Sequence, residues 1–502
     1  MKGFSEKVYL SLKMPESEDS ISDSSRICLA LEALGYGRVH MPLHVLRKLY
    51  PTCRNGNFEI TVTVVSGELG WVITDVEVGD TRAQHYGLAV DYGSTTMVME
   101  LVDMNSGKVI ASAKEVNAQV AYGTDILSRI TYAMEQTDHM EDLQQAAAKT
   151  INHLLERITE ESGIRAAELG AMILSGNTTM IHFLLGLDAW TVFAEPYAPV
   201  VSEPGFFWGR ELNLDFSGLI YIVPAASNYI GGDIISGLLK LQIHKQEEVS
   251  LFFDIGTNGE LVLGNRHWIL AGAGAAGPAL EGYISRFGMR AAPGAVDSVK
   301  IRGGELHITT IDGAQAVGIC GSGIIDLLAQ MRRNGWMNIA GELVPEASER
   351  IVWLEEEGEY AVVYAKEGRD LFFTQTDIRQ YLDTKAAAYT MVECLLESAG
   401  VTAAEVDRLY LSGAFAAHSS IDSAVTVGMY PDLPREKYRI LNNTSLEGAR
   451  ILLLNREKRE EAEILARNLY CVQFASVPDF LVRMQAAKFV PHTDMSRFPS
   501  VL

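Results

Sequence analysis

Cysteine is scarce in this chain of 502 residues, and the few cysteines are scattered. No two of them form a C-x-x-C pair. Iron–sulfur clusters and structural zinc ions are held by several thiolates, usually with close motif spacing, so we expect neither in this chain. The odd number and wide spacing favour reduced thiols, as in a cytoplasmic protein. The five are Cys28, Cys53, Cys320, Cys394 and Cys471.

Positive charge is also in short supply. The chain has 42 Lys and Arg against 64 Asp and Glu, which gives a formal net charge of −22 at pH 7. Contacts with nucleic-acid phosphates and with anionic membrane surfaces both depend on clustered basic side chains. The sequence therefore predicts no nucleic-acid partner and no membrane partner.

Long apolar runs are missing as well. No stretch reaches the roughly 18 apolar residues that a membrane-spanning helix needs, and the segment MKGFSEKVYLSLKMPESEDS lacks the apolar core of a signal peptide. Hydrophobic residues make up 48% and charged residues 21%, which is ordinary for globular proteins. We expect a soluble, cytoplasmic protein with two or three domains.

Residues 1–85 have the pattern of a small α/β domain. Lys7–Leu12 and Phe58–Val65 alternate as strands do, and Ser24–Leu34 fits a helix. This segment shows no residues with an evident chemical role, so we interpret it as a linker-type domain. From Tyr86 onward the pattern changes to buried strands, glycine turns and amphipathic helices, which is typical of α/β domains.

Two pairs of similar segments follow each other in the same order. HYGLAVDYGSTTMVMELVD (85–103) and LFFDIGTNGELVLGN (251–265) each predict a strand, a D-x-G turn and a second strand. IRAAELGAMILSGN (164–177) and VTAAEVDRLYLSGA (401–414) share Ala-Ala-Glu and Leu-Ser-Gly in one register. Two matches in order indicate a duplicated domain. A cleft between two such lobes is where a small ligand would bind.

The duplication predicts three domains and their approximate bounds. The second half is longer by about 74 residues, which indicates an insertion at about 266–365. The predicted domains are a small α/β domain at 1–85, a first lobe at 86–235 and a second lobe at 236–502.

The two D-x-G turns offer the groups that a nucleotide phosphate needs. Backbone N–H groups in such turns form a concavity for phosphate oxygens, and glycine keeps it open. Asp91 and Asp254 end the first strand of each hairpin, where a carboxylate could hold a hydrated Mg²⁺. The alternative is that each D-x-G is only a tight β-turn. The other expected ATP-binding residues of the turns are Gly93, Ser94, Thr95, Thr96, Gly256, Thr257, Asn258 and Gly259.

A second group of candidates comes from the Leu-Ser-Gly segments and nearby carboxylates. Ser412, Gly413, Ala414 and Phe415 end a buried strand in mostly small residues, where a base or ribose could approach closely, although a tight helix–strand contact would explain Gly413 equally well. Asp233, Glu260 and Asp125 are candidates to orient a catalytic water. For each of these carboxylates a structural role is the alternative.

Several longer motifs resemble one family within a larger superfamily. The paired hairpins and the late strand-glycine element resemble the superfamily of actin, sugar kinases, acetate kinase and the seventy-kilodalton heat-shock chaperones. The motifs closely resemble those of the reductive activators of corrinoid (cobalamin-dependent) methyl-transfer proteins, over about residues 5 to 490. The motifs are YGLAVDYGSTT, NAQVAYGTDILSRI, LSGNTTMIHFLLGL, VPAASNYIGGDIISGLL, DIGTNGELVLGN, GICGSGIIDLL and LPREKYRILNNTSLEGAR.

The resemblance implies a fold, an activity and a set of partners. The fold would be two duplicated actin-like, ribonuclease H-like lobes with a central cleft. The activity would be ATP-dependent return of a corrinoid protein from Co(II) to Co(I). By position, 91–96 would be the first phosphate loop, 254–260 the second, and 411–415 the adenosine element. A homodimer is one possible assembly.

The chain departs from this family in one respect. Such activators usually carry an iron–sulfur domain with clustered cysteines, and no cysteine group of that kind is present here. We therefore expect no iron–sulfur cluster in this chain and a separate ferredoxin-like electron donor. A longer parent chain, or loss of electron transfer, would also explain the departure. The competing functions are a small-molecule kinase of the same superfamily and a nucleotide-sensing interaction module without turnover.

Overall fold

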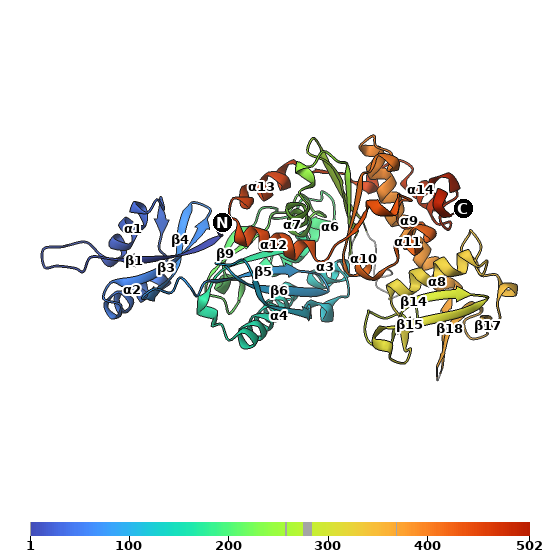
Figure 1. Ribbon diagram of the computed structural model, residues 1–502, viewed down its shortest axis with the longest axis horizontal. Coiled ribbons are helices and arrows are strands. Elements are labelled where there is room, and N and C mark those ends of the chain that lie inside the picture. Colours follow the sequence, from blue (N-terminus) through green and yellow to red (C-terminus); the bar gives the residue numbers. More distant parts are fainter. Residues whose placement is uncertain (1, 257–258, 275–283, 368, 502) are drawn as a thin grey trace. The chain divides into compact units, whose positions relative to one another are not determined.

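Two units make up the chain in this computed structural model, and each is assembled from two separate segments. Unit 1 comprises Met1–Gln242 and Thr444–Asn468, and unit 2 comprises Ile243–Asn443 and Leu469–Leu502. The structure describes residues 2–256, 259–274, 284–367 and 369–501 (Figure 1). Within these residues, no helix combines the length and the apolar character needed to cross a bilayer.

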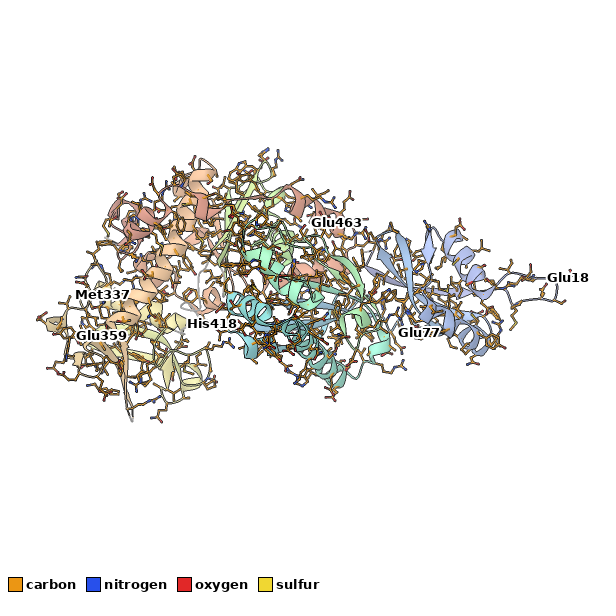
Figure 2. The ribbon with its side chains drawn as sticks, turned by 180° about the vertical axis from the view of Figure 1, so that it is seen from behind. Glu18, Glu77, Met337, Glu359, His418 and Glu463 are labelled. Carbon is orange, nitrogen blue, oxygen red and sulfur yellow. The ribbon has the colours of Figure 1, made fainter. Side chains whose placement is uncertain are left out.

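The N-terminal part of unit 1 is a four-stranded sheet with two helices. The strand order is β1-β3-β4-β2, with β1 antiparallel to β3. Alternation in β3 places Ile60, Val62 and Val64 in a core that α1 and α2 complete. A partly buried ion pair joins Lys7 to Glu77, which is labelled in Figure 2. The elements are β1 (Ser5–Ser11), α1 (Asp23–Ala33), β2 (Val39–His40), α2 (Leu43–Asn55), β3 (Glu59–Gly67) and β4 (Gly70–Val78).

The main sheet of unit 1 has six strands in the order β7-β6-β5-β8-β10-β9. β5, β6 and β7 form an antiparallel meander, while β5, β8 and β10 are parallel. Every residue of β8 is buried, as expected for a strand covered on both faces. The strands are β5 (Tyr86–Tyr92), β6 (Thr96–Asp103), β7 (Val109–Val116), β8 (Leu169–Gly176), β9 (Gly205–Trp208) and β10 (Leu219–Ile222).

Helices cover both faces of this sheet. In Figure 1, α4 lies on one side of β5 and β6 and α12 on the other. The apolar residues of α4 recur at helical spacing, as in Leu143, Ala147 and Ile151, and pack on the sheet. The helices are α3 (Ile126–Glu135), α4 (His139–Ser162), α5 (Thr178–Leu185), α6 (Trp190–Phe193), α7 (Gly232–Leu241), α12 (Thr444–Leu454) and α13 (Lys458–Asn468).

The main sheet of unit 2 repeats the same plan. Its order is β21-β20-β11-β12-β13-β22, with an antiparallel meander β11-β12-β13 and with β20 and β21 parallel to β11. The strands are β11 (Ser250–Ile255), β12 (Gly259–Gly264), β13 (Ile269–Gly274), β20 (Arg408–Ser412), β21 (Tyr438–Ile440) and β22 (Tyr470–Cys471).

Between β13 and α9, unit 2 carries two further three-stranded sheets, ordered β15-β14-β16 and β17-β18-β19. Their strands are β14 (Ala295–Arg302), β15 (Glu305–Thr310), β16 (Gly318–Ile319), β17 (Ile351–Leu354), β18 (Glu359–Glu367) and β19 (Arg369–Thr374). The α-helices of unit 2 are α8 (Gly321–Arg333), α9 (Gln375–Ser398), α10 (Ala414–His418), α11 (Ile421–Val427) and α14 (Phe480–Ala487).

The two main sheets share small details as well as strand order. A short 3₁₀ turn precedes β8 at Ala166–Glu168 and another precedes β20 at Ala403–Glu405. In each turn the glutamate accepts a hydrogen bond from the backbone N–H three residues earlier, Arg165 or Thr402, at 2.8 Å. The duplication predicted from Ala-Ala-Glu and Leu-Ser-Gly is therefore confirmed, and with it the two-lobed α/β fold.

Candidate functional site

The first D-x-G turn connects β5 to β6 in unit 1. Asp91 and Tyr92 end β5, and the chain passes through Gly93, Ser94 and Thr95 before β6 begins at Thr96. A Cβ on Gly93 would lie only 2.4 Å from the carbonyl oxygen of Thr96. The turn therefore closes tightly on itself, and only glycine fits at its first position.

The Leu-Ser-Gly segment of unit 1 lies directly beside this turn. In the parallel pairing of β5 and β8, Asp91 is opposite Ser175 and Tyr92 is opposite Gly176. A Cβ on Gly176 would lie 2.9 Å from the carbonyl oxygen of Tyr92. The carboxyl ends of both strands thus meet at one edge of the sheet, where ligands of open α/β sheets bind.

Unit 2 repeats this arrangement at the second D-x-G turn. Asp254 is opposite Ser412 in the pairing of β11 and β20. A Cβ on Gly413 would lie 2.0 Å from the carbonyl oxygen of Ile255, and Gly413 has φ +97°. Ile255 follows Asp254 as Tyr92 follows Asp91, so the glycines hold equivalent places in the two units.

The second turn is described only in part. Gly256 follows β11 and Gly259 begins β12, while Thr257 and Asn258 lie outside the described residues. Glu260 is directly opposite Asp254 in the hairpin and is buried. Residues directly opposite in an antiparallel pair point to the same face, so Glu260 and Asp254 share one face of the sheet.

The residues after β20 continue into a short helix. Ala414 begins α10, and Phe415 belongs to the apolar core of unit 2. His418 is at the end of α10 (Figure 2). The Ser412 hydroxyl donates to the carbonyl oxygen of Asn442 at 3.1 Å. The burial of Phe415 supports a packing role for its ring.

Asp233 lies at the same sheet edge as Asp91, and Asp125 has a structural partner. A Cβ built on Gly231 would lie 2.7 Å from both the Asp233 carboxylate and the Gly176 carbonyl oxygen. Asp233 is in the first turn of α7. Asp125 caps α3, because its carboxylate accepts the Ser128 N–H at 2.9 Å. Capping accounts for the position of Asp125 without a ligand.

Three linked serine hydroxyls form a chain that begins at Asp91. Ser445, in the first turn of α12, donates to a carboxylate oxygen of Asp91 at 2.8 Å and lies 3.1 Å from the Ser175 hydroxyl. Ser175 in turn lies 2.8 Å from the Ser236 hydroxyl and 2.9 Å from the Gly232 carbonyl oxygen. Ser445 and Ser236 were not predicted from the sequence, because no local pattern links residues that are so far apart in the chain.

Each unit carries, at its own D-x-G turn, a carboxylate and a tight backbone turn. Among the residues that the structure describes, no group of three or more His, Cys, Asp or Glu side chains gathers to hold a metal ion. At Gly93 and at Gly413 a Cβ would collide with a carbonyl oxygen of the protein, that of Thr96 or of Ile255, so both glycines permit a close approach of the backbone. Backbone N–H groups of such turns suit phosphate oxygens. Carboxylate oxygens such as those of Asp91 and Asp254 are among the ligands that Mg²⁺ prefers.

Three family models together match nearly the whole chain. The RACo linker region matches residues 1–83, the RACo middle region matches 86–246, and the C-terminal domain of RACo, described as the ASKHA domain, matches 248–502. The last of these covers about half of the chain by itself.

A solved structure and two curated proteins are similar to the chain. The structure of a reductive activator for a corrinoid, iron–sulfur protein has a TM-score of 0.89 and 35% identity, covering 100% of this chain and 81% of that one. The corrinoid activation enzyme RamQ of Eubacterium limosum is 27% identical over 84% of this chain and 73% of its own length.

The [Co(II) methylated amine-specific corrinoid protein] reductase of Methanosarcina barkeri is 26% identical, over 76% of this chain and 73% of its own length. The family models match residues of both units. These matches and the similarity to the solved activator agree with the duplicated fold and with the resemblance seen in the motifs. The chain therefore belongs to the RACo family of reductive corrinoid activators, within the ASKHA superfamily.

Proposed function

We propose that the protein is an ATP-dependent activator of a corrinoid protein and assists the reduction of its cobalt from Co(II) to Co(I). The observation that carries the proposal is the repeated turn, with Asp91 opposite Ser175 and Asp254 opposite Ser412. The names of the relatives in E. limosum and M. barkeri support the corrinoid part of the proposal.

The reduction takes one electron, and we assign its source to a separate ferredoxin-like iron–sulfur protein. Four of the five cysteines lie in four different elements, α1, α2, α9 and β22, and Cys320 directly precedes α8. Thiolates that ligate one cluster must be gathered at a single place, and this distribution supports an external donor.

ATP would be bound through its phosphates at Gly93–Thr96 and at Gly256–Gly259, with Asp91 and Asp254 as Mg²⁺ ligands. Magnesium bound there would supply positive charge to the phosphate oxygens. Hydrolysis adds water to the γ-phosphorus and releases ADP and phosphate, and Asp233 and Glu260 are the candidates to orient that water. ATP would act on the corrinoid protein by binding one conformation of the activator more tightly than another.

The decisive experiment follows Co(I) formation by visible absorption under anaerobic conditions. It combines a Co(II) corrinoid protein, a reduced ferredoxin, the activator and ATP. We expect fast reduction only when activator and ATP are both present. Asp91→Asn and Asp254→Asn should each lower ATP hydrolysis and Co(I) formation at least about ten-fold. The reason is that phosphoryl transfer is catalysed mainly by the positioning of the reacting groups and by electrostatic stabilisation. Asp75→Asn, in the N-terminal sheet, is the control and should retain activity.

Three results would overturn parts of this proposal. Reduction at the same rate without activator or ATP would remove the activator function. Phosphate transfer from ATP to a small metabolite would indicate the kinase instead. ATP binding without phosphate release or cobalt reduction would indicate the nucleotide-sensing module.

A further inference from the structure

A closed group of buried amide side chains lies directly behind the first D-x-G turn. Asn117 follows the last residue of β7, and Gln119 is in the 3₁₀ turn that comes next. Both side chains are fully buried in unit 1. Buried polar side chains are costly unless they are hydrogen-bonded, so their partners indicate why they are placed there.

Asn117 holds two carbonyl groups of the turn. Its side-chain Nδ2 donates to the Gly93 carbonyl oxygen at 3.1 Å, and its backbone N–H donates to the Thr95 carbonyl oxygen at 2.9 Å. One residue thus fixes the first and the last peptide groups of the Gly93–Thr95 turn from the interior of the protein.

Fixing these carbonyl groups also sets the direction of two N–H groups. In a planar trans peptide, the C=O of one residue and the N–H of the next point in opposite directions. Because the carbonyl oxygens of Gly93 and Thr95 point at Asn117, the N–H groups of Ser94 and Thr96 point away from it. That is the orientation a phosphate-binding turn needs.

Gln119 holds Asn117 in place. Its Oε1 accepts from Asn117 Nδ2 at 3.2 Å and from the Tyr92 hydroxyl at 3.2 Å. Its Nε2 donates to the Leu143 carbonyl oxygen of α4 at 2.8 Å, and its backbone N–H donates to Asn117 Oδ1 at 3.0 Å. Asn117 is therefore anchored to the long helix through Gln119, and both ends of the turn are linked to that anchor.

We propose that Asn117 and Gln119 are positioning residues that pre-arrange the first turn for the phosphates of the nucleotide. Neither side chain needs to touch the ligand, because they act on the backbone that does. This inference rests on the proposed function for ATP itself, but the geometry of the turn can be tested without any nucleotide.

The test uses Asn117→Ser, in which the hydroxyl still caps the 3₁₀ turn but is too short to reach Gly93. We expect the affinity for ATP to fall about ten-fold, which corresponds to the loss of one or two buried hydrogen bonds. Affinity for adenosine, which has no phosphate, should stay within about two-fold. Amide hydrogen exchange at 94–96 should be faster in the variant without nucleotide.

Two further variants separate positioning from general stability. Gln119→Met removes the acceptor that holds Asn117 and should weaken ATP binding less than Asn117→Ser does. Thr150→Val is the matched control. The buried Thr150 hydroxyl accepts the Ala118 N–H of the 3₁₀ turn at 3.1 Å, and this bond involves no residue of the Gly93–Thr95 turn. This variant should cost similar stability and leave ATP affinity unchanged.

An ATP affinity of Asn117→Ser within about two-fold of the wild type would overturn the inference, as would an equal loss for adenosine. If Asn117→Ser fails to fold, unchanged ATP affinity in Gln119→Met would overturn it instead. Absence of ATP binding by the wild-type protein would count against the proposed function, while the exchange measurement would still decide whether Asn117 orders the turn.

Discussion

At the scale of single residues, Gly413 occupies a place where no side chain fits. Its φ of +97° is strained for other residues, and its Cβ would lie 2.0 Å from the Ile255 carbonyl oxygen. Gly413→Ala should therefore force β20 away from β11 in addition to straining the backbone. We expect a loss of about 3 kcal/mol or more in the free energy of unfolding, measured by urea denaturation.

Gly400 provides the matched control for this prediction. It also has positive φ, +65°, but nothing lies within 4 Å of its Cβ position. Gly400→Ala should therefore cost only the backbone strain, about 1 kcal/mol. Equal losses of stability in the two variants would show that the close approach of Gly413 to Ile255 adds nothing to the cost of an alanine at this position.

The sequence indicated some of these residues and missed others for a physical reason. Asp91, Gly93, Asp254 and Gly413 belong to short motifs whose spacing can be read locally, and their roles with ATP stay predictions. Ser445 contacts Asp91 across 354 positions of the chain. A hydrogen bond between such distant segments depends on the completed fold, so a local pattern carries no signal for it.

At the scale of elements, the hairpins β5–β6 and β11–β12 were predictable because apolar strands flank a glycine turn in each. The parallel pairing of β8 with β5 and of β20 with β11 was not predicted, because these strands are far apart in the chain. Two of the edge strands, β22 and β9, were not predictable. β22 has 2 residues and β9 has 4, which is too short for a periodic pattern.

His85 connects the N-terminal sheet to the main sheet of unit 1 and makes this junction sensitive to acid. Its Nε2 lies 2.8 Å from the Ser5 hydroxyl, and its side chain is buried. Burial lowers the pKa of His85 to about 4. In the unfolded chain the pKa is about 6.5, so the unfolded state binds the proton first as the pH falls.

The pKa shift of His85 predicts a definite pH dependence of stability. Neutral His85 makes its full contribution to the free energy of unfolding above about pH 6.5. This contribution is lost as the pH falls toward 4, and the loss reaches about 3 kcal/mol. His85→Gln, which cannot titrate, should lose less stability than the wild type over this range. Denaturant unfolding of both proteins at several pH values measures the difference. Parallel curves would contradict the prediction.

At the scale of the whole molecule, the chain leaves unit 1 at Gln242 and returns to it at Thr444. The returning helix α12 packs on β5, β8 and α7. Its Leu446, Leu452 and Leu453 are buried, and its Gly448 lies so close to α7 that a Cβ would be 2.0 Å from the Ser236 carbonyl oxygen. From the sequence this segment was predicted to belong to the second lobe, 236–502, because the pattern of a helix does not specify which sheet it covers.

This chain path predicts that residues 1–242 alone do not form a stable unit 1. Without α12, the fragment lacks the burial of three leucines, which is worth roughly 6 kcal/mol and comparable to the whole stability of many domains. Residues 1–242 joined to 444–468 by a short Gly/Ser linker should fold. The junction is feasible because Lys240 and Glu447 form an ion pair at 2.6 Å, so the two ends lie near each other.

Thermal unfolding followed by circular dichroism should be cooperative for the joined fragment and absent or broad for 1–242. Leu452→Asp in the joined fragment is the control, since a buried unpaired charge should return it to the behaviour of 1–242. Equal cooperativity and midpoint for 1–242 and the joined fragment would show that α12 is not part of the folded core of unit 1.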